Sequence, residues 1–319
     1  MTSISPRHDL SRPTRSPTKV STSWLGPKLR RREAIAGYLA IAPWLLGFIA
    51  FALGPMVASF IFMFTRWEIL RPPVWSGLEN LDKLVNDPLV GQSLLNTAFY
   101  TFLAIPLNLA FALVVAVLLN SNLPGTNIFR TVFYLPSQMP AVASAILWFL
   151  VFSPNYGLAN QVLSWFGIAP LRWLWDVQLV KPSLVIMHAW AIGAPMVIFL
   201  AGLQAIPVTL YEAAEIDGAG SLAQFWNITL PMLSPTIFFN MIMGFIGSFQ
   251  VFTNVFIMTS GGPGNASLML VLYIYRQAFE YFNMGYASAL SWVLFLVVLA
   301  LTVIQFQISD RWVYYEGDQ

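Results

Sequence analysis

The chain of 319 residues is 57% hydrophobic and only 9% charged, with a mean hydropathy of +0.68 and a formal net charge of +2. A soluble globular protein carries about 25% charged residues, so the composition excludes that class and indicates an integral membrane protein. The small net charge gives no reason to expect nucleic-acid binding, and the absence of cysteine excludes disulfides and cysteine-based metal sites.

Residues 1–33 are predicted to be a disordered, basic tail. Half of the chain's 16 Lys and Arg residues lie in this segment, which is otherwise rich in Ser, Thr and Pro and cannot bury an apolar core. A signal peptide is the alternative interpretation. The apolar run that follows is, however, much longer than the roughly 7–15 residues of a signal-peptide core.

Long stretches without charge predict the membrane-spanning helices, because a charged side chain at the bilayer centre is costly. Each of the six runs approaches or exceeds the ~20 residues that cross about 30 Å of hydrocarbon. The sequence therefore predicts an all-α membrane protein with six transmembrane helices in a domain of residues 34–312, followed by a short tail of residues 313–319. The six runs are 38–64, 94–119, 131–152, 183–205, 234–258 and 286–308.

The basic tail predicts the orientation, since Lys and Arg next to a span favour the cytoplasmic side. Six crossings then return the C-terminus, with Asp310 and Arg311, to the cytoplasm. We expect a multi-pass protein of the bacterial plasma (inner) membrane, in which the segment between the fourth and fifth helices is a cytoplasmic loop.

That loop, residues 207–231, contains three acids and no base. The nearest Lys or Arg is Lys181 before it and Arg276 after it, so Glu212, Glu215 and Asp217 have no such partner close in sequence. Solvated acids on an interfacial helix are one explanation. Such helices usually carry Lys and Arg toward anionic lipid, which this loop lacks, so a protein partner is favoured.

Two short helices are predicted within the loop. Pro207 suits the start of the first helix, and Gly218 suits the left-handed residue that closes it. Ser221 and Gln224 have the spacing of a capping box at the start of the second helix, and Pro231 is expected to end it.

The loop contains the pattern EAA, three residues, G, nine residues, I, x, L, P. This resembles the EAA loop of the membrane-spanning subunits of binding-protein-dependent ABC importers. Further stretches resemble the carbohydrate-uptake branch of that family, which includes the maltose and glycerol-3-phosphate permeases. They are GTNIFRTVFYLP (125–136), GLQAIPVTLYEAAEIDGAG (202–220), TSGGPG (259–264) and YIYRQAFEYFNMGYASAL (273–290). The matching loop residues are Glu212, Ala213, Ala214, Gly218, Ile228, Leu230 and Pro231.

The resemblance implies a permease subunit that imports a sugar or a related polyol or oligosaccharide. It also implies four kinds of partner: a homologous second permease subunit, an ATPase subunit dimer, an extracytoplasmic solute-binding protein and the lipid bilayer. Glu212 would face a basic residue of the ATPase and Gly218 would provide a bend. The extra N-terminal helices and the large external domain of the maltose-type subunit are absent, so the chain looks closer to the shorter permeases.

No catalytic residue, metal site or cofactor is expected on this chain. It has no G-x4-G-K-[ST] loop, so ATP would be bound by the partner subunit, and it has no H-E-x-x-H motif. His188, in the fourth predicted helix, is either a functional group in the membrane or a histidine bonded to a neighbouring helix.

Polar residues within the spans are candidates for the substrate path. Gln250 and Asn254 are spaced i, i+4 and would share one face of the fifth helix. Hydrogen bonding between helices is the structural alternative. The last three predicted spans contain no Lys or Arg, which favours a neutral sugar. The candidates are Trp190, Ser248, Gln250 and Asn254.

Two other classes of function remain as alternatives. An ion-coupled secondary transporter would usually have internal repeats and intramembrane acids, and neither is evident. An intramembrane enzyme that uses His188 would need a nucleophile or metal-ligand constellation, and no such motif occurs.

Overall fold

The computed structural model describes residues 27–121 and 125–314, with side chains from residue 31 onward. Most of the predicted N-terminal tail and the last five residues lie outside the described residues. The first helix, α1, begins at Pro27, inside the segment predicted to be disordered, because the run KLRRREA consists largely of strong helix formers. The chain divides into two compact units, residues 1–57 and 58–319.

The described part of the first unit, residues 27–57, is helical with a local irregularity. The α-helix α1 (Pro27–Phe48) is followed by a π-helical segment, η2 (Ile49–Leu53), and by the start of α2 (Gly54–Phe62). Residues 31–62 are long and apolar enough to span a membrane.

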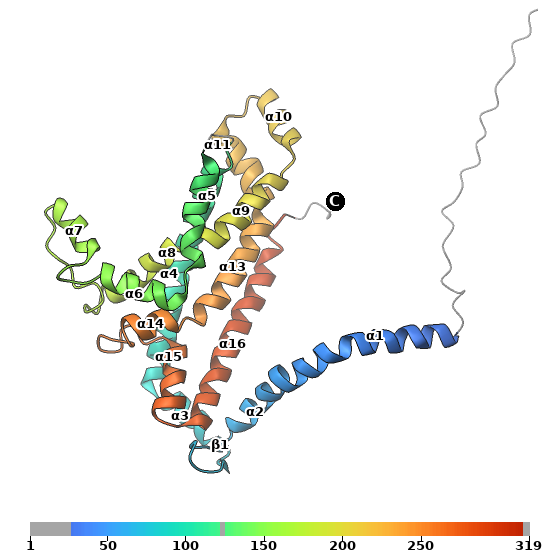
Figure 1. The fold of residues 1–319 in the computed structure, drawn as a ribbon, viewed down its shortest axis with the longest axis vertical. Coiled ribbons are helices and arrows are strands. Elements are labelled where there is room, and N and C mark those ends of the chain that lie inside the picture. Colours follow the sequence, from blue (N-terminus) through green and yellow to red (C-terminus); the bar gives the residue numbers. More distant parts are fainter. Residues whose placement is uncertain (1–26, 122–124, 315–319) are drawn as a thin grey trace, which may run out of the picture. The chain divides into compact units, whose positions relative to one another are not determined.

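The second unit is a helical bundle that opens with a two-stranded hairpin (Figure 1). Its helices up to the fourth predicted span are α3 (Glu79–Asn86), α4 (Pro88–Leu119), α5 (Thr126–Tyr134), η3 (Leu135–Gln138), α6 (Ala141–Val151), α7 (Leu158–Trp165), α8 (Val180–Trp190) and α9 (Gly193–Ala205). The remaining helices are α10 (Val208–Ile216), α11 (Ser221–Gln224), η4 (Phe225–Thr229), α12 (Leu230–Met232), α13 (Ser234–Phe249), α14 (Thr253–Met258), α15 (Leu270–Tyr275), η5 (Arg276–Glu280) and α16 (Met284–Ser309).

Three described helices are long and apolar enough to cross a membrane by themselves, and three bent helix pairs bring the count to as many as six. The bent pairs, α5–η3 with α6, α8 with α9, and α11–α12 with α13, change direction by 99°, 46° and 61°. This agrees with an all-α membrane protein of six spans.

Proline explains where these bends fall. Pro140 directly precedes α6, Pro195 lies in the first turn of α9, and Pro235 lies in the first turn of α13. Proline cannot donate a helical hydrogen bond, and it disfavours helical geometry in the residue before it. A hydropathy run passes through such a break unchanged, so the sequence predicted each of these spans as a single helix and gave no sign of the bend.

The fifth predicted span is shorter than expected. The helix α13 ends at Phe249, and α14 begins only at Thr253. The N–H groups of Gln250 and Val251 donate to the carbonyls of Gly247 and Ser248, each at 3.2 Å, which closes the helix in a tight turn. Because the residues after the break are also apolar, the sequence predicted one continuous helix, which the backbone does not form.

The helix α4 is the centre of the second unit, because α8, α9, α13 and α15 all pack against it. Three buried apolar clusters surround it, and the largest includes fully buried Leu270, Leu272 and Leu290. Figure 1 shows α10 and α11 at one end of this bundle and α3 at the other.

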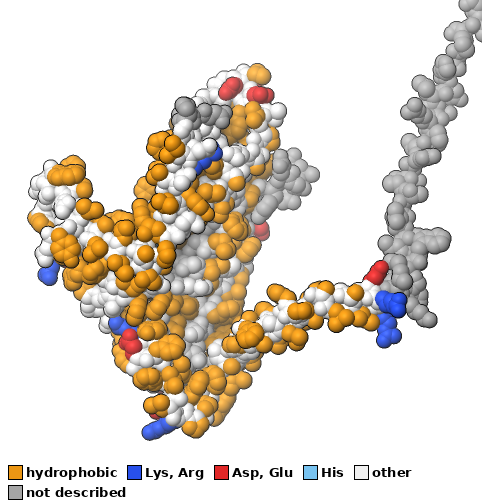
Figure 2. Space-filling view, viewed as in Figure 1, with side chains coloured by type: hydrophobic (Ala, Val, Ile, Leu, Met, Phe, Trp, Pro, Cys, Tyr) orange, Lys and Arg blue, Asp and Glu red, His pale blue; other side chains and the backbone are white. Residues whose placement is uncertain are grey.

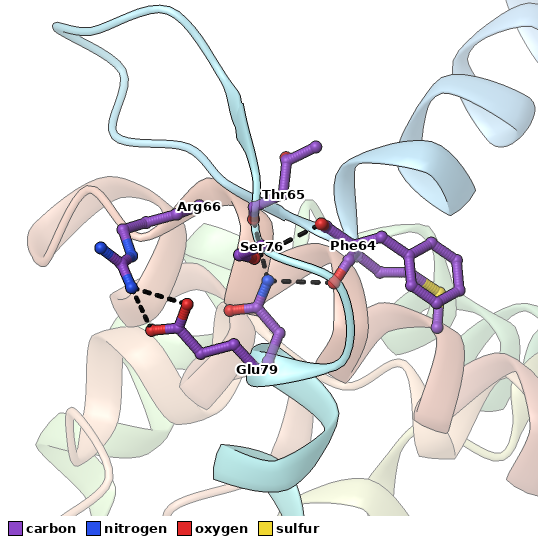
Figure 3. Close-up of polar contacts among 7 residues, drawn as sticks. Phe64, Thr65, Arg66, Ser76 and Glu79 are labelled. Atoms are coloured by element: carbon purple, nitrogen blue, oxygen red, sulfur yellow. Dashed lines mark hydrogen bonds and ion pairs between the residues drawn. The ribbon is translucent and has the colours of Figure 1, made fainter.

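The hairpin next to α3 was not predicted. Its strands β1 (Thr65–Arg66) and β2 (Val74–Trp75) are antiparallel. Nη2 of Arg66 donates to both carboxylate oxygens of Glu79, at 2.6 and 2.7 Å, and this ion pair is shown in Figure 3. The buried amide of Asn80 donates to the carbonyls of Met63 and Thr65 at 2.9 and 2.8 Å.

Asp87 fixes the N-terminus of α4 at this end of the bundle. Its carboxylate accepts hydrogen bonds from the hydroxyls of Tyr273 and Tyr286, the latter at 2.7 Å, and from the backbone N–H of Leu89 at 2.9 Å. Burial alone would raise the pKa of Asp87, but these hydrogen bonds and the nearby Lys83 outweigh it and lower the pKa. Asp87 therefore ties α4, α15 and α16 together as an anion.

Candidate functional site

The helix α10 begins and ends where the sequence predicted. Pro207 is its N-cap residue. The N–H of Gly218 donates to the carbonyl of Glu215 at 3.0 Å. The N–H of Ala219 donates to the carbonyl of Ala214 at 2.8 Å, which completes a Schellman motif. Gly218 has a φ of +80°, in the left-handed region that favours glycine.

Two predictions for the second helix of the loop are wrong. Ser221 is the first residue of α11 rather than its cap, and the amide of Gln224 donates to the carbonyl of Ala219 at 3.2 Å, so no capping box forms. The helix also continues through Pro231, because the π-helical turn η4 precedes it. A π turn is wider than an α turn and accommodates a residue that lacks an N–H.

The three acids of the loop face solvent. Glu212, Glu215 and Asp217 are exposed, whereas Ala214 beside them is half-buried. None of the ion pairs found among the described residues includes these acids. Figure 2 shows acidic side chains gathered at the end of the bundle that α10 occupies. The fold therefore presents an acidic surface on α10 that forms no ion pair within the described part of the chain.

The EAA-like pattern divides into an outward and an inward half. Glu212 and Ala213 are exposed on α10. Ile228 instead packs against the buried cluster of α4 and α9, and Leu230 lines an apolar cavity of 310 Å³ beside α4. Pro231 is half-buried. The second half of the pattern thus anchors the loop in the bundle, while the first half is free for contact.

A cavity within the membrane domain brings polar side chains from three helices together. It has a volume of 400 Å³ and lies between α4, α8, α9 and α13. Its polar lining consists of Asn108, His188, Asn240 and Ser248, and the remaining walls are apolar. The lining holds no carboxylate, ammonium or guanidinium group, and most of it is apolar.

Hydrogen bonds between helices hold three of these four polar residues, Asn108, His188 and Ser248. The hydroxyl of Tyr100 lies 3.2 Å from Nδ1 of His188, and the amide of Asn108 donates to the carbonyl of His188 at 2.9 Å. The hydroxyls of Thr101 and Ser248 lie 2.8 Å apart. His188 is therefore bonded to a neighbouring helix, as the structural interpretation of the sequence expected.

The four predicted path residues do not form one face. Ser248 lines the cavity, whereas the ring of Trp190 meets Trp148 edge-on at 5.7 Å. Gln250 is the exposed C-cap residue of α13, and Asn254 lies on α14, with its buried Oδ1 unpaired among the described residues. The predicted common face for Gln250 and Asn254 is wrong, because the helix ends between them.

The sequence reasoning missed two polar residues of the cavity, Asn108 and Asn240. Both are amides inside uncharged runs, the same signal that singled out Gln250. Asn240 is bonded within its own helix, where its amide donates to the carbonyl of Thr236 at 3.0 Å. Among the described residues, no group of three His, Asp or Glu side chains could hold a metal ion.

The apolar spans, the cavity between them and the exposed acidic loop at one end indicate a multi-pass membrane protein of the transport class. Residues 108–313 match the family described as "Binding-protein-dependent transport system inner membrane component". The chain belongs to this family, so it is a membrane component of a binding-protein-dependent ABC transport system.

Relatives of known sequence extend over nearly the whole chain. The probable ABC transporter permease protein YesP of Bacillus subtilis (strain 168) is 41% identical over 294 residues, which cover 91% of this chain and 95% of that protein. The arabinooligosaccharides transport system permease protein AraP of the same organism is 36% identical over 279 residues, or 86% of this chain and 88% of that protein.

The fold is also similar to a solved structure. The crystal structure of a bacterial ABC transporter that imports the acidic polysaccharide alginate contains a chain that superposes with a TM-score of 0.77 at 23% identity. The match covers 89% of this chain and 97% of that chain.

Proposed function

We propose that this chain is the permease subunit of an importer for a sugar or oligosaccharide, driven by a separate ATPase dimer. It pairs with a second, homologous permease subunit and receives solute from an extracytoplasmic binding protein. The observation that carries the proposal is the exposed acidic surface of α10 at one end of the bundle. Its acids form no ion pair with any Lys or Arg among the described residues.

Glu212 pairs with a basic group of the ATPase in this proposal, and Gly218 sets the angle at which α10 meets it. ATP is bound by the ATPase and not by this chain. The small, exposed Ala213 next to Glu212 lets α10 approach a partner surface closely. The loop is cytoplasmic, as are both termini.

Movement of α10 has a direct route into the membrane domain. One residue, Pro207, separates α10 from Ile206 at the end of α9. The hydroxyl of Tyr211 on α10 lies 2.9 Å from that of Thr229 in η4, which leads through α12 into α13. Because α9 and α13 both line the central cavity, a shift of α10 would change the cavity walls, which is the requirement of alternating access.

The solute is proposed to be a neutral sugar. Permeases for arabinooligosaccharides, trehalose and maltose, and lactose are among the relatives by name. The cavity offers hydroxyl and amide groups without charge, which suits a hydroxyl-rich ligand. We place Ser248, Asn108 and Asn240 on the path, with Gln250, Asn254 and Trp190 as further candidates.

Co-purification from native membranes tests the proposal. We expect an ATPase subunit to accompany the tagged wild-type protein and to be lost from Glu212→Lys. Glu68→Lys is the matched control, because Glu68 is an exposed acid on the hairpin loop and lies outside α10. If both variants recover the same amount of ATPase, Glu212 does not take part in the contact. Absence of any ATPase with wild type, or uptake that stops on collapse of ion gradients while ATP remains, would favour an ion-coupled transporter.

A further inference from the structure

The segment from α6 to α7 is uncharged over an unusual length. Between Arg130 and Arg172 the chain has no Asp, Glu, Lys or Arg. This stretch includes α6, which belongs to a bent span, and also α7, which is too short to cross a membrane. A loop helix without charge is unsuited to a free aqueous surface.

The helix α7 has three distinct sides. Ala159 and the buried Asn160 face the bundle, and Ala159 packs against its largest apolar cluster. Ser164, a polar residue, is exposed on the second side. The third side carries exposed apolar residues at i, i+4, i+7 and i+8. They are Leu158, Val162, Trp165 and Phe166, of which the last two are 80% and 75% exposed.

This exposed apolar side is held rigidly. The amide of Asn160 donates to the carbonyls of Pro154 and Leu171 at 3.1 and 3.0 Å, and its oxygen accepts from the indole of Trp173 at 2.9 Å. A Cβ added at Gly157 would lie 2.4 Å from the carbonyl oxygen of Ser153, so the chain enters α7 by a turn that only glycine fits. The apolar side is thus built into the fold.

An apolar groove continues this surface onto α6. It has a volume of 660 Å³, and side chains of α6 such as Ile146 and Leu150 line it together with Tyr156 and Leu158 before and at the start of α7. Figure 2 shows apolar side chains over the α6–α7 part of the molecule. The groove is continuous with a helix pair that crosses the membrane.

We propose that α7 is an interfacial helix, lying in the membrane–water boundary with its apolar side in lipid, and that a phospholipid acyl chain occupies the groove against α6. Exposed Trp and Phe beside a polar side are typical of this boundary, where aromatic rings sit at headgroup level. Contact with lipid brings no charged group of this stretch into the hydrocarbon, because residues 131–171 contain none. The proposal does not depend on the solute or on the ATPase.

Single-cysteine spin labelling tests this proposal, because this chain has no cysteine of its own and is labelled before the transporter is assembled. Val162→Cys and Ile146→Cys place labels on the apolar side and in the groove, and Ser164→Cys is the matched control on the polar side of the same helix. In proteoliposomes of the assembled transporter, we expect the ratio of oxygen to nickel-chelate collisions to be several-fold higher at 162 and 146 than at 164.

Two results would overturn the proposal. Equal nickel access at positions 162 and 164 would make the apolar side an aqueous surface. A label at 162 that is immobile and shielded from both oxygen and nickel would make it a protein interface, with the second permease subunit if this holds in the isolated transporter, or with the binding protein if it appears only after that protein is added.

Discussion

The hydroxyl of Tyr211 lies 2.9 Å from the hydroxyl of Thr229, and this bond joins the exposed helix α10 to the π-helical turn that leads into α13. Thr229 is buried, and its hydroxyl is also 3.4 Å from the carbonyl of Gln224. The bond therefore links the surface proposed to meet the ATPase to a wall of the central cavity.

Tyr211→Phe should weaken this link without removing the ring that packs against the bundle. A typical hydrogen bond contributes about 1 kcal/mol, so we expect a small loss of stability and a larger loss of solute-stimulated ATP hydrolysis in the assembled transporter. Tyr156→Phe, at an exposed tyrosine of the α6–α7 loop, is the control. Stimulation that is unchanged in Tyr211→Phe would show that the hydroxyl pair does not transmit movement.

Gly218→Ala should distort the end of α10. A left-handed residue other than glycine costs roughly 1–2 kcal/mol, and Gly218 has a φ of +80°. We expect reduced uptake at normal membrane levels of the protein, because α10 would be displaced relative to its partner. Gly220→Ala is the control: Gly220 has a φ of −72°, and an added Cβ would meet nothing within 4 Å. Equal uptake by the two variants would contradict the role of the Schellman turn.

Asp87→Asn should destabilise the end of the bundle opposite α10, and the effect should depend on pH. Because the folded pKa of Asp87 is below its ordinary value of 3.8, its ionised form stabilises the fold above pH 3.8, and this contribution is lost as the pH falls through the folded pKa. We expect a lower melting temperature for the variant at pH 7 and a smaller difference near pH 3, measured in detergent. Burial and the bond to Asp87 also raise the pKa of Tyr273, so that tyrosine remains a donor throughout this range.

The class and the loop could be predicted because both depend on local chemistry. Low charge and long apolar runs arise because a charged group in hydrocarbon is costly. That cost does not depend on the details of packing. The start and end of α10 could be predicted because Pro207 and Gly218 act through backbone geometry that each residue carries with it.

The remaining features depend on contacts between distant parts of the chain. Hydropathy gives no signal for the end of α13 at Phe249, so Gln250 and Asn254 were wrongly placed on one helix. Asn108 and His188 lie 80 positions apart in the sequence. They meet at the cavity only because α8 packs on α4. The predicted capping box does not form, because the amide of Gln224 donates to the carbonyl of Ala219 in the adjoining turn instead.

Gln250→Ala separates the transport role of a polar residue from a structural one. Gln250 is exposed at the C-cap of α13, two residues after Ser248, which lines the cavity together with Gly247. Truncation of an exposed amide removes no buried contact, so assembly and thermal stability should be unchanged. If the amide bonds a sugar hydroxyl, the loss of about 1 kcal/mol should raise the KM of uptake about fivefold. Ser248→Ala provides the contrast, because it leaves the buried hydroxyl of Thr101 without its 2.8 Å partner and should lower stability as well as uptake. Uptake kinetics in Gln250→Ala identical to those of wild type would remove this residue from the solute path, and the polar groups inside the cavity would then be the ones to test.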